Sequence, residues 1–530
     1  MFSDRSMLKP FKLSQHVKFF CFPALVLSTI CFCGCETTDY EPLIMKKKLK
    51  EMDKKIQQLE QTIESLQSPV PPTNSTSTPE SSATPPAPAA PDAPADRPPA
   101  KSSSAGSSSI KQASVASPTT AVAIAEKQVA TEKRSPVADL ILAIKSAGGY
   151  TTTDASGAIV KVDFSETRRF KDTLPKLASI KSLQHLSLNG LQTDSSVFKT
   201  LAAFTTLERL DIQHSSPTAA DLDNLKKIPT LKFIELTRAN LDSAGFAALS
   251  KFPALEQIRC AQSQVNDEAV SHLKQLKTLR AIDLTGNPVT DKALESLQDL
   301  PKISFLKVSG KQITNTGMAA VSRMKKLKVL ALKETAVTDA GAQSLGSLKN
   351  LREAHFFRTA VSDRTLEALS ASPELTTLNL RGTKVSDAGA AALAKLPKLS
   401  KLDLSETTSP GLTAAGIKSL STIASLKSLN LWSTPTGDDA VEHLVKMKNV
   451  TWLNLDNTPV TDAGVSRLNE MPQLTWLHLG KTATTDESVA ALKQLANLKY
   501  LSVRQSKVSE AGYKQLDDFF YAKGCELVAP

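Results

Sequence analysis

The sequence predicts an α/β solenoid of about fifteen stacked units, with a parallel sheet on the concave face and helices on the convex face. Three observations predict it. Pairs of apolar residues recur at a constant period from residue 159 onward, as in the series Leu186, Leu210 and Ile234. Each pair flanks a single variable residue, which is typical of a short strand that buries one face. In the clearest units a T-D-A-G motif follows the strand and is a good start for a helix.

The period is interrupted once, between Leu402 and Leu429, by a longer step whose three extra residues lie in the loop Thr407–Gly416. Units that repeat at this spacing cannot bury their apolar face alone, so stacked neighbours must build the core. The apolar pairs are Val162/Phe164, Leu186/Leu188, Leu210/Ile212, Ile234/Leu236, Ile258/Cys260, Ile282/Leu284, Leu306/Val308, Leu330/Leu332, Ala354/Phe356, Leu378/Leu380, Leu402/Leu404, Leu429/Leu431, Leu453/Leu455, Leu477/Leu479 and Leu501/Val503.

One unit, "LKVLALKETAVTDAGAQSLGSLKN", shows the expected order of elements. The leucines of L-x-L point inward from a strand, and threonine or aspartate of the T-D-A-G motif caps a helix. Proline follows the helix in several units, where the helix must stop. A threonine after the strand is expected to bond the backbone at the turn; these residues are Thr335, Thr383, Thr458 and Thr482.

This pattern resembles the leucine-rich repeat, particularly its cysteine-containing and ribonuclease-inhibitor-like classes. Threonine stands where those classes have cysteine or asparagine. Secreted and lipid-anchored bacterial proteins with T-x-V-T-D-A-G-L repeats are similar as well. The resemblance covers residues 150–530, implies the solenoid fold and says almost nothing about function.

Both ends of the solenoid are expected to carry caps. Residues 135–158 form the first cap, with a helix that starts at Ser135–Pro136 and ends at Gly148–Gly149, followed by a turn into the first strand. Residues 159–506 hold the repeats, and residues 507–530 supply a closing helix and an edge strand. Cys260 and Cys525 are ten units apart and cannot pair.

Residues 1–34 are predicted to be an export signal, with a basic stretch followed by an uncharged run. The sequence "FCGC" resembles the lipobox of bacterial lipoproteins, with Phe32 where leucine is usual. The resemblance implies lipidation of Cys35, a lipid-anchor segment over 35–44 and, from Glu36, the outer rather than the inner membrane. A plain transmembrane anchor is the alternative. Either reading places the rest of the chain outside the cytoplasm.

Residues 45–67 are predicted to be a short coiled coil, because apolar residues alternate at steps of four and three. The pattern favours a parallel homodimer through residues 45–66, and a lone amphipathic helix on the membrane is the alternative. Residues 68–134 are rich in proline, serine and alanine and are predicted to be a disordered linker.

The sequence predicts a protein that is not an enzyme. It lacks the metal-binding, nucleophile and phosphate-loop motifs, and its seven histidines are scattered. We therefore expect no catalytic residue, metal or cofactor. The net charge of +11 is modest for 530 residues and includes no arginine-rich run, so no nucleic-acid partner is expected.

The variable residues of the strands face the concave sheet and are free to form a binding surface. Aromatic residues gather there near the C-terminal end, and exposed aromatic residues usually mark a contact surface. An internal aromatic ladder that only stacks on itself is the alternative. The predicted site residues are Trp432, Trp452, Trp476, Tyr500, Asn430, Asn454, Asp456 and His478. Weaker candidate patches are Phe233 with Phe305, and His355 with Phe357 and Arg358.

We thus expect a non-enzymatic scaffold of the cell envelope, anchored to the membrane by lipid, that recognises a protein partner with the concave face. Two alternatives stay open at this point. A polysaccharide or cell-wall binder would use the Trp/Tyr column as a platform for sugar rings, and a purely structural envelope element would bind nothing with it.

Overall fold

The computed structural model describes residues 136–529 except 166, 168 and 408–410. All of them belong to one compact unit that spans residues 114–530. None of the described helices is both long and apolar enough to cross a membrane. Several predicted segments lie outside the described residues and stay predictions: the signal peptide (1–34), Cys35 with its anchor segment (35–44), the coiled coil (45–67) and the linker (68–134).

A single sheet of seventeen strands runs through the described residues. From β2 to β17 each strand pairs in parallel with the next, one repeat further on, so that Leu378 lies beside Leu402. The strands are β1 Tyr150–Thr153, β2 Ile159–Asp163, β3 His185–Ser187, β4 Arg209–Asp211, β5 Phe233–Glu235, β6 Gln257–Arg259, β7 Ala281–Asp283, β8 Phe305–Ser309, β9 Val329–Lys333, β10 Glu353–His355, β11 Thr377–Asn379, β12 Lys401–Asp403, β13 Ser428–Asn430, β14 Trp452–Asn454, β15 Trp476–His478, β16 Tyr500–Ser502 and β17 Glu526–Val528.

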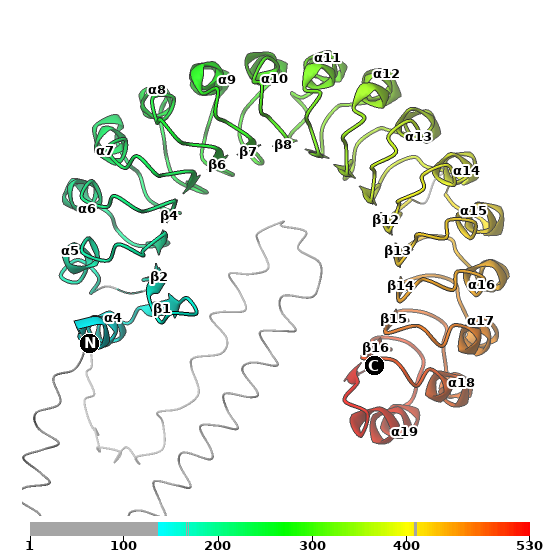
Figure 1. Ribbon diagram of the computed structural model, residues 1–530. Helices are drawn as coiled ribbons and strands as arrows, with labels where there is room; N and C mark the ends of the chain where they lie inside the picture. Colours follow the sequence, from blue (N-terminus) through cyan, green and yellow to red (C-terminus); the bar gives the residue numbers. More distant parts are fainter. Residues whose placement is uncertain (1–135, 166, 168, 408–410, 530) are drawn as a thin grey trace, which may run out of the picture. The chain divides into compact units, whose positions relative to one another are not determined.

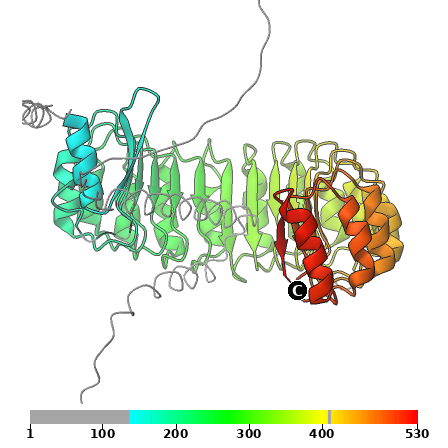
Figure 2. The same ribbon diagram turned by 90° about the horizontal axis from the view of Figure 1, so that it is seen from below.

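One helix follows most strands, and the helices line the outer side of the curve while the strands line its inner side (Figure 1). Figure 2 shows the strands side by side within the same unit. The predicted fold class is therefore confirmed. The α-helices are α4 Pro136–Ser146, α5 Leu174–Leu177, α6 Ser195–Leu201, α7 Ala219–Leu225, α8 Ser243–Leu249, α9 Asp267–His272, α10 Asp291–Leu297, α11 Asn315–Arg323, α12 Asp339–Ala342, α13 Asp363–Leu369, α14 Asp387–Leu393, α15 Ala414–Leu420, α16 Asp438–Leu444, α17 Asp462–Arg467, α18 Val489–Gln494 and α19 Glu510–Tyr521. Short 3-10 helices are η1 Leu273–Gln275, η2 Gln343–Ser347, η3 Leu468–Glu470 and η4 Asp486–Ser488.

The core is one continuous apolar layer between the sheet and the helices. The inward residues of the strands are almost completely buried in every repeat, as with Leu330 and Leu332 at 0% exposure. Cys260 takes a leucine position in this core, and both Cys260 and Cys525 are free thiols, as the sequence predicts.

The caps differ from expectation in one element. Helix α4 and its end at Gly148, with φ 84°, are present, as are the closing helix α19 and the edge strand β17. The segment after α4 was expected to be only a turn, but it forms β1, which pairs antiparallel with β2. The Asp154 carboxylate accepts bonds from Ser156 and Ala158 and closes this hairpin, with Gly157 at φ 83°.

Three of the four threonines predicted to bond the backbone after the strands do so. Thr383, Thr458 and Thr482 each donate to the carbonyl of the second inward leucine, at 2.5–2.7 Å. The prediction is wrong for Thr335, whose buried hydroxyl has no hydrogen-bond partner among the described residues.

The aspartate of the T-D-A-G motif links neighbouring repeats. The sequence had suggested that threonine or aspartate caps the helix, but the aspartate does not cap its own helix. Threonine or serine is usually the N-cap, and the aspartate is the first helical residue. The Asp438 carboxylate accepts two bonds from Thr461 of the next repeat, from the backbone N at 2.8 Å and from the hydroxyl at 2.6 Å. We call this recurring contact the aspartate ladder; its acceptors are Asp267, Asp291, Asp339, Asp363, Asp387, Asp438, Asp462 and Asp486.

The glycine of the motif makes room for this contact. A Cβ atom built on Gly464 would collide with the Asp438 carboxylate of the preceding repeat. Where the glycine is absent, a hydroxyl can take its place and bond the same carboxylate, as Thr365 does to Asp339 at 2.6 Å. The motif thus stabilises the stacking of one repeat on the next.

The turns off the strands contain a residue in the left-handed conformation, two positions after the second inward residue. Most of these positions carry residues other than glycine, among them Glu334, Glu406 and Lys481. A left-handed residue with a side chain costs about 1–2 kcal/mol. The solenoid therefore accepts a small strain at most turns to keep neighbouring strands in register.

Replacing Lys481 by glycine is expected to raise the free energy of unfolding by about 0.5–1 kcal/mol. Lys481 has φ 53° and its side chain is exposed, so glycine relieves strain without losing packing. Lys499→Gly is the matched control, because Lys499 is exposed and has no positive φ; it is expected to lower stability. Urea unfolding measures both. A loss of stability in Lys481→Gly would show that the turn is not strained.

Candidate binding surface

The predicted site lies on the inner face of strands β13 to β16. Parallel pairing places Trp452, Trp476 and Tyr500 directly beside one another. His478 lies two residues after Trp476 and so points to the same face. The structure therefore brings these four residues together, and we call them the tryptophan cluster.

The rings of the tryptophan cluster pack on one another. Trp476 and Tyr500 are stacked, with centroids 4.1 Å apart and ring planes 4° apart. The His478 ring lies 4.8 Å from Tyr500, 5.6 Å from Trp452 and 6.0 Å from Trp476. Contacts of this kind are favourable beyond the burial of area.

The expected exposure is wrong for Trp476 in the aromatic column and for His478 beside it. Trp476 is only 6% exposed and His478 only 7%, whereas Trp452 and Tyr500 are half-buried. Strands about 4.8 Å apart hold large flat rings at stacking distance, so each ring shields the next. The internal ladder, left open as the alternative, thus describes Trp476 and His478, and Trp452 and Tyr500 keep accessible surface.

The predicted polar residues mostly support the backbone. The side-chain oxygen of Asn430 accepts from the Trp432 backbone at 3.1 Å, and that of Asn454 accepts from Asp456 at 2.8 Å. Asp456 contacts His478, with Oδ2 3.5 Å from Nδ1. His478 Nε2 is buried without a hydrogen-bond partner among the described residues. Both asparagines thus bond the backbone just after their strands, Asn430 at Trp432 and Asn454 at Asp456.

Trp432 belongs to a second group of side chains, further along the strands. Arg381 lies between two rings, with Cζ 4.7 Å from the Trp432 centroid and 5.2 Å from that of Phe357. Two more cations face Phe357, namely Arg358 at 5.0 Å and Lys333 at 5.4 Å. Trp432 makes no ring contact with Trp452 within the part of the chain that the structure describes. The predicted patch is therefore two separate clusters.

Glu406 completes this second group, which we call the arginine cluster: Lys333, Phe357, Arg358, Arg381, Glu406 and Trp432. The Glu406 carboxylate bonds the Arg381 guanidinium at 3.2 Å and lies 3.3 Å from that of Arg358. Burial opposes ionisation of Glu406, but the bonds and charge of Arg381 and Arg358 outweigh it, so the pKa is lowered. A charged carboxylate thus holds both guanidinium groups in place.

The sequence analysis found only part of the arginine cluster. It singled out Trp432 and, as a weaker patch with His355, Phe357 and Arg358. Residues 357, 381 and 432 occupy the same position of the repeat. Residue 381 follows residue 357 by one period, and residue 432 follows residue 381 by one period plus the single longer step. Reading that column for cations as well as aromatic rings would have found Arg381. The insertion next to Trp432 includes residues 408–410, which lie outside the described residues.

The other weak patch, Phe233 with Phe305, is not a patch. Strands β6 and β7 separate the two residues. Phe233 is 6% exposed and lies under Arg209, whose Cζ is 3.8 Å from the ring centroid. On the same strand, burial raises the pKa of Glu235 in spite of hydrogen bonds from Thr237 and the charge of the nearby Arg259. Phe233 and Glu235 are therefore both buried and offer little surface to a partner.

The arginine cluster is the part of the sheet face best suited to binding. Its aromatic and cationic groups are held in place by contacts within the protein, and Phe357, Arg381 and Trp432 stay half-exposed. Arginine and tryptophan dominate binding energy where protein surfaces meet. The arrangement offers a flat apolar contact together with hydrogen-bond donors to an acceptor-rich partner.

Comparison with known proteins begins with the family. Residues 187–444 match the family model of a leucine-rich repeat region. No curated protein matches the sequence. Similar solved structures include an internalin of Listeria monocytogenes (15% identity, covering 74% of this chain and 93% of that chain, TM-score 0.39). A leucine-rich repeat protein of Leptospira interrogans is similar as well (16%, 67% and 92%, 0.43). A third is the Arabidopsis receptor kinase HAESA, solved with a peptide hormone and a co-receptor (16%, 71% and 78%, 0.38).

The matching family model describes a leucine-rich repeat region. It covers the repeats that carry the arginine cluster and ends shortly before β14, the first strand of the tryptophan cluster. Together with the parallel sheet of regularly repeated units, this match shows that the chain contains a leucine-rich repeat region and folds, over its described residues, as a leucine-rich repeat solenoid.

Proposed function

We propose that this chain is a non-enzymatic binding scaffold of the cell envelope that recognises a protein partner with the inner face of its sheet. The observation that carries the proposal is the placement of Arg381 between Phe357 and Trp432, fixed by Glu406. Side chains that are already ordered before binding lose little entropy when a partner docks. The tryptophan cluster adds the accessible parts of Trp452 and Tyr500 to the same face.

The envelope location rests on the sequence of residues 1–36 alone. A lipid on Cys35 would hold the chain at a membrane, with the outer membrane favoured over the inner one. The linker 68–134 would let the repeats reach away from the surface. A homodimer through residues 45–66 would place two binding faces side by side and increase the apparent affinity for a repeated partner.

A glycan ligand is the second candidate. It is favoured by the half-buried rings of Trp452 and Tyr500, which flank the buried Trp476 and could stack on sugar rings. A structural element that binds nothing is the remaining alternative.

Replacing Arg381 and Trp432 together by alanine is expected to weaken partner binding by about thirtyfold, the effect of losing about 2 kcal/mol at a hot spot. The full-length chain and this variant would be passed over an envelope extract separated into protein and glycan fractions. The captured molecule would then be titrated against both. The matched control is Arg323→Ala/Tyr521→Ala, which removes one arginine and one exposed aromatic residue from helices α11 and α19.

Each outcome decides between the candidates. Capture from the protein fraction that is lost in the Arg381/Trp432 variant alone supports the proposal. Capture from the glycan fraction that is lost in Trp452→Ala supports the second candidate. Equal capture by the wild type and the variants contradicts a site on this face. No capture by any of the folded proteins favours a structural element.

A further inference from the structure

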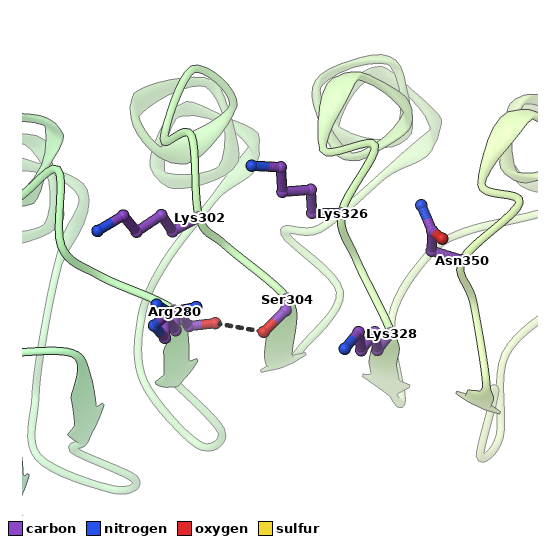
Figure 3. A pocket seen from close by; sticks show the side chains of 6 residues that line it. All are labelled: Arg280, Lys302, Ser304, Lys326, Lys328 and Asn350. Carbon is purple, nitrogen blue, oxygen red and sulfur yellow. Dashed lines mark hydrogen bonds between the residues drawn. The ribbon is translucent and has the colours of Figure 1, made fainter.

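A groove lies on a different surface of the solenoid, on the flank made by the segments that run from each helix to the next strand. It has a volume of about 330 Å³ and spans the repeats of β7 to β10. Figure 3 shows Lys302 and Lys326 on the connecting segments, and Arg280, Ser304 and Lys328 where the strands begin. The lining residues are Arg280, Lys302, Ser304, Lys326, Lys328 and Asn350. Four of the six carry a positive charge and none carries a negative one.

Three of these cations lack an ionic partner among the described residues. Arg280 pairs with Glu256, with Nε 3.1 Å from the carboxylate oxygen. Lys302, Lys326 and Lys328 form no ion pair within the described part of the chain, and all three are exposed. The Ser304 hydroxyl and the Asn350 amide donate to backbone carbonyls, at 3.2 and 2.8 Å. The free hydrogen-bond donors of the groove are therefore mainly ammonium groups.

Elsewhere on the same flank, the preceding repeat neutralises lysines at matching positions. Lys232 pairs with Glu208 at 2.9 Å and occupies the position of Lys328, directly after the first leucine of its unit. Lys398 pairs with Glu374 at 2.5 Å and occupies the position of Lys326, directly before that leucine.

The groove interrupts this pairing. In both pairs the carboxylate comes from the matching position one repeat before the lysine. One repeat before Lys328, the matching position carries Ser304. One repeat before Lys326, it carries Lys302. A hydroxyl and a third cation thus stand where the pattern would place two carboxylates.

An adjacent groove shows the contrast. It shares Lys326 and is lined by Arg323, but it also contains Asp299, which lies 3.3 Å from the Arg323 guanidinium. Its charge is partly balanced from within the protein, whereas that of the first groove is not. A groove lined by several positive charges without an ionic partner attracts a multivalent anion.

We propose that the groove lined by Lys302, Lys326 and Lys328 binds a ligand that presents two or more phosphate groups. Each ammonium has three donors that can turn toward separate oxygens, which suits a tetrahedral oxyanion. The planar Arg280 guanidinium, which could bind a carboxylate or a phosphate, already pairs with Glu256, so the three lysines are the available cations. The phosphates could belong to a lipid headgroup or to a soluble phosphorylated polymer. This site goes beyond the proposed function and does not depend on it.

A nucleic acid fits the groove less well. Binding of single strands relies on aromatic side chains that stack on the bases, and no aromatic residue lines this groove. The unpaired cations extend over only two consecutive repeats, which is short for a duplex whose phosphates follow one another closely along its whole length.

The test compares Lys326→Gln/Lys328→Gln with Lys232→Gln/Lys398→Gln in the full-length chain. Both double variants remove two positive charges from matching positions of the flank, but the control removes lysines that are already paired. Calorimetric titration with inorganic tripolyphosphate is expected to show a dissociation constant raised at least about tenfold in the first variant and within about twofold of wild type in the control. Citrate, a tricarboxylate, should bind the wild type more weakly than tripolyphosphate.

A second arm identifies the source of the phosphate. Phosphatidylcholine vesicles with one part in five of phosphatidic acid are compared with vesicles of phosphatidylcholine alone. A difference between the two variants on phosphatidic acid alone supports a lipid headgroup, and a difference with tripolyphosphate alone supports a soluble ligand. Three results would overturn the proposal: equal weakening in both variants, absence of wild-type binding to both tripolyphosphate and phosphatidic acid, or equal affinity for citrate and tripolyphosphate. A single-stranded oligonucleotide that binds more tightly than tripolyphosphate, and is lost in the same variant, would overturn it in favour of nucleic acid.

Discussion

Replacing Phe356 by alanine is expected to lower the free energy of unfolding by about 3–5 kcal/mol. Phe356 is completely buried, and its strand is unusual because the other inward residue is the small Ala354. The large ring fills space that two leucines fill in most other repeats. Removing it leaves a cavity in the middle of a continuous core, where neighbouring repeats on both sides resist collapse. Urea unfolding monitored by circular dichroism measures the loss.

Two further variants test this explanation. Phe357→Ala changes the adjacent ring, which points to the opposite face and is half-exposed, and should cost less than about 1 kcal/mol. The double variant Ala354→Leu/Phe356→Leu restores the leucine pair of the neighbouring repeats and should recover most of the lost stability. Equal losses in Phe356→Ala and Phe357→Ala would mean that volume in the core is not the cause.

Replacing Asp462 by alanine is expected to cost about 2–3 kcal/mol, because it removes a charged acceptor of the aspartate ladder that has three partner groups. Its carboxylate accepts from the Thr485 backbone at 2.8 Å, from the Thr485 hydroxyl at 2.7 Å and from the Ser488 hydroxyl. Asp462→Asn is the matched variant and should cost less than half as much. Asn315 already occupies an equivalent position and accepts from the Thr338 backbone at 2.9 Å.

The cost of Asp462→Ala should depend on pH. Burial opposes ionisation of Asp462, but the bonds from Ser488 and Thr485 outweigh it and leave its pKa below the ordinary 3.8. A carboxylate whose pKa is lowered by folding stabilises the protein above its unfolded value, and this stabilisation is lost as the pH falls through the folded value. The difference between wild type and Asp462→Ala should therefore be largest near pH 7 and should shrink below about pH 3.8. A difference that stays constant with pH would contradict a charged ladder.

The two proposed sites use different positions of the repeating unit. The arginine cluster occupies the variable residues at the ends of the strands, and the basic groove occupies the residues on either side of the first leucine. Neither set contributes to the leucine core. A repeat protein can therefore change both surfaces without changing its fold, and loss of one site need not affect the other.

Much of the fold could be predicted from the sequence because the signal is repeated. A constant period, the L-x-L strand and the T-D-A-G helix start determine the solenoid, its parallel sheet and the direction of the inward leucines. Local chemistry also predicted α4 and α19. The hairpin strand β1 was missed, since four residues with three threonines carry no clear alternation until β2 is placed beside them.

The candidate site could be predicted only in outline. The sequence showed which residues point to the inner face, because alternation along a strand decides that. It could not show that Trp476 and His478 would be buried by their neighbours, or that Trp432 would contact Arg381, two strands before it, and not Trp452 on the next strand. Those outcomes depend on the distance between strands and on the directions that long side chains take across them.

The aspartate ladder and the basic groove show the same division. The sequence by itself determined the repeat, the inward leucines and the helix starts, because these follow from contacts within one unit and its period. The tertiary structure alone decided that the aspartate of one unit bonds the threonine of the next, and that Lys302, Lys326 and Lys328 line one groove without a carboxylate. Both depend on which residues of successive repeats come into contact, and only stacking brings them together.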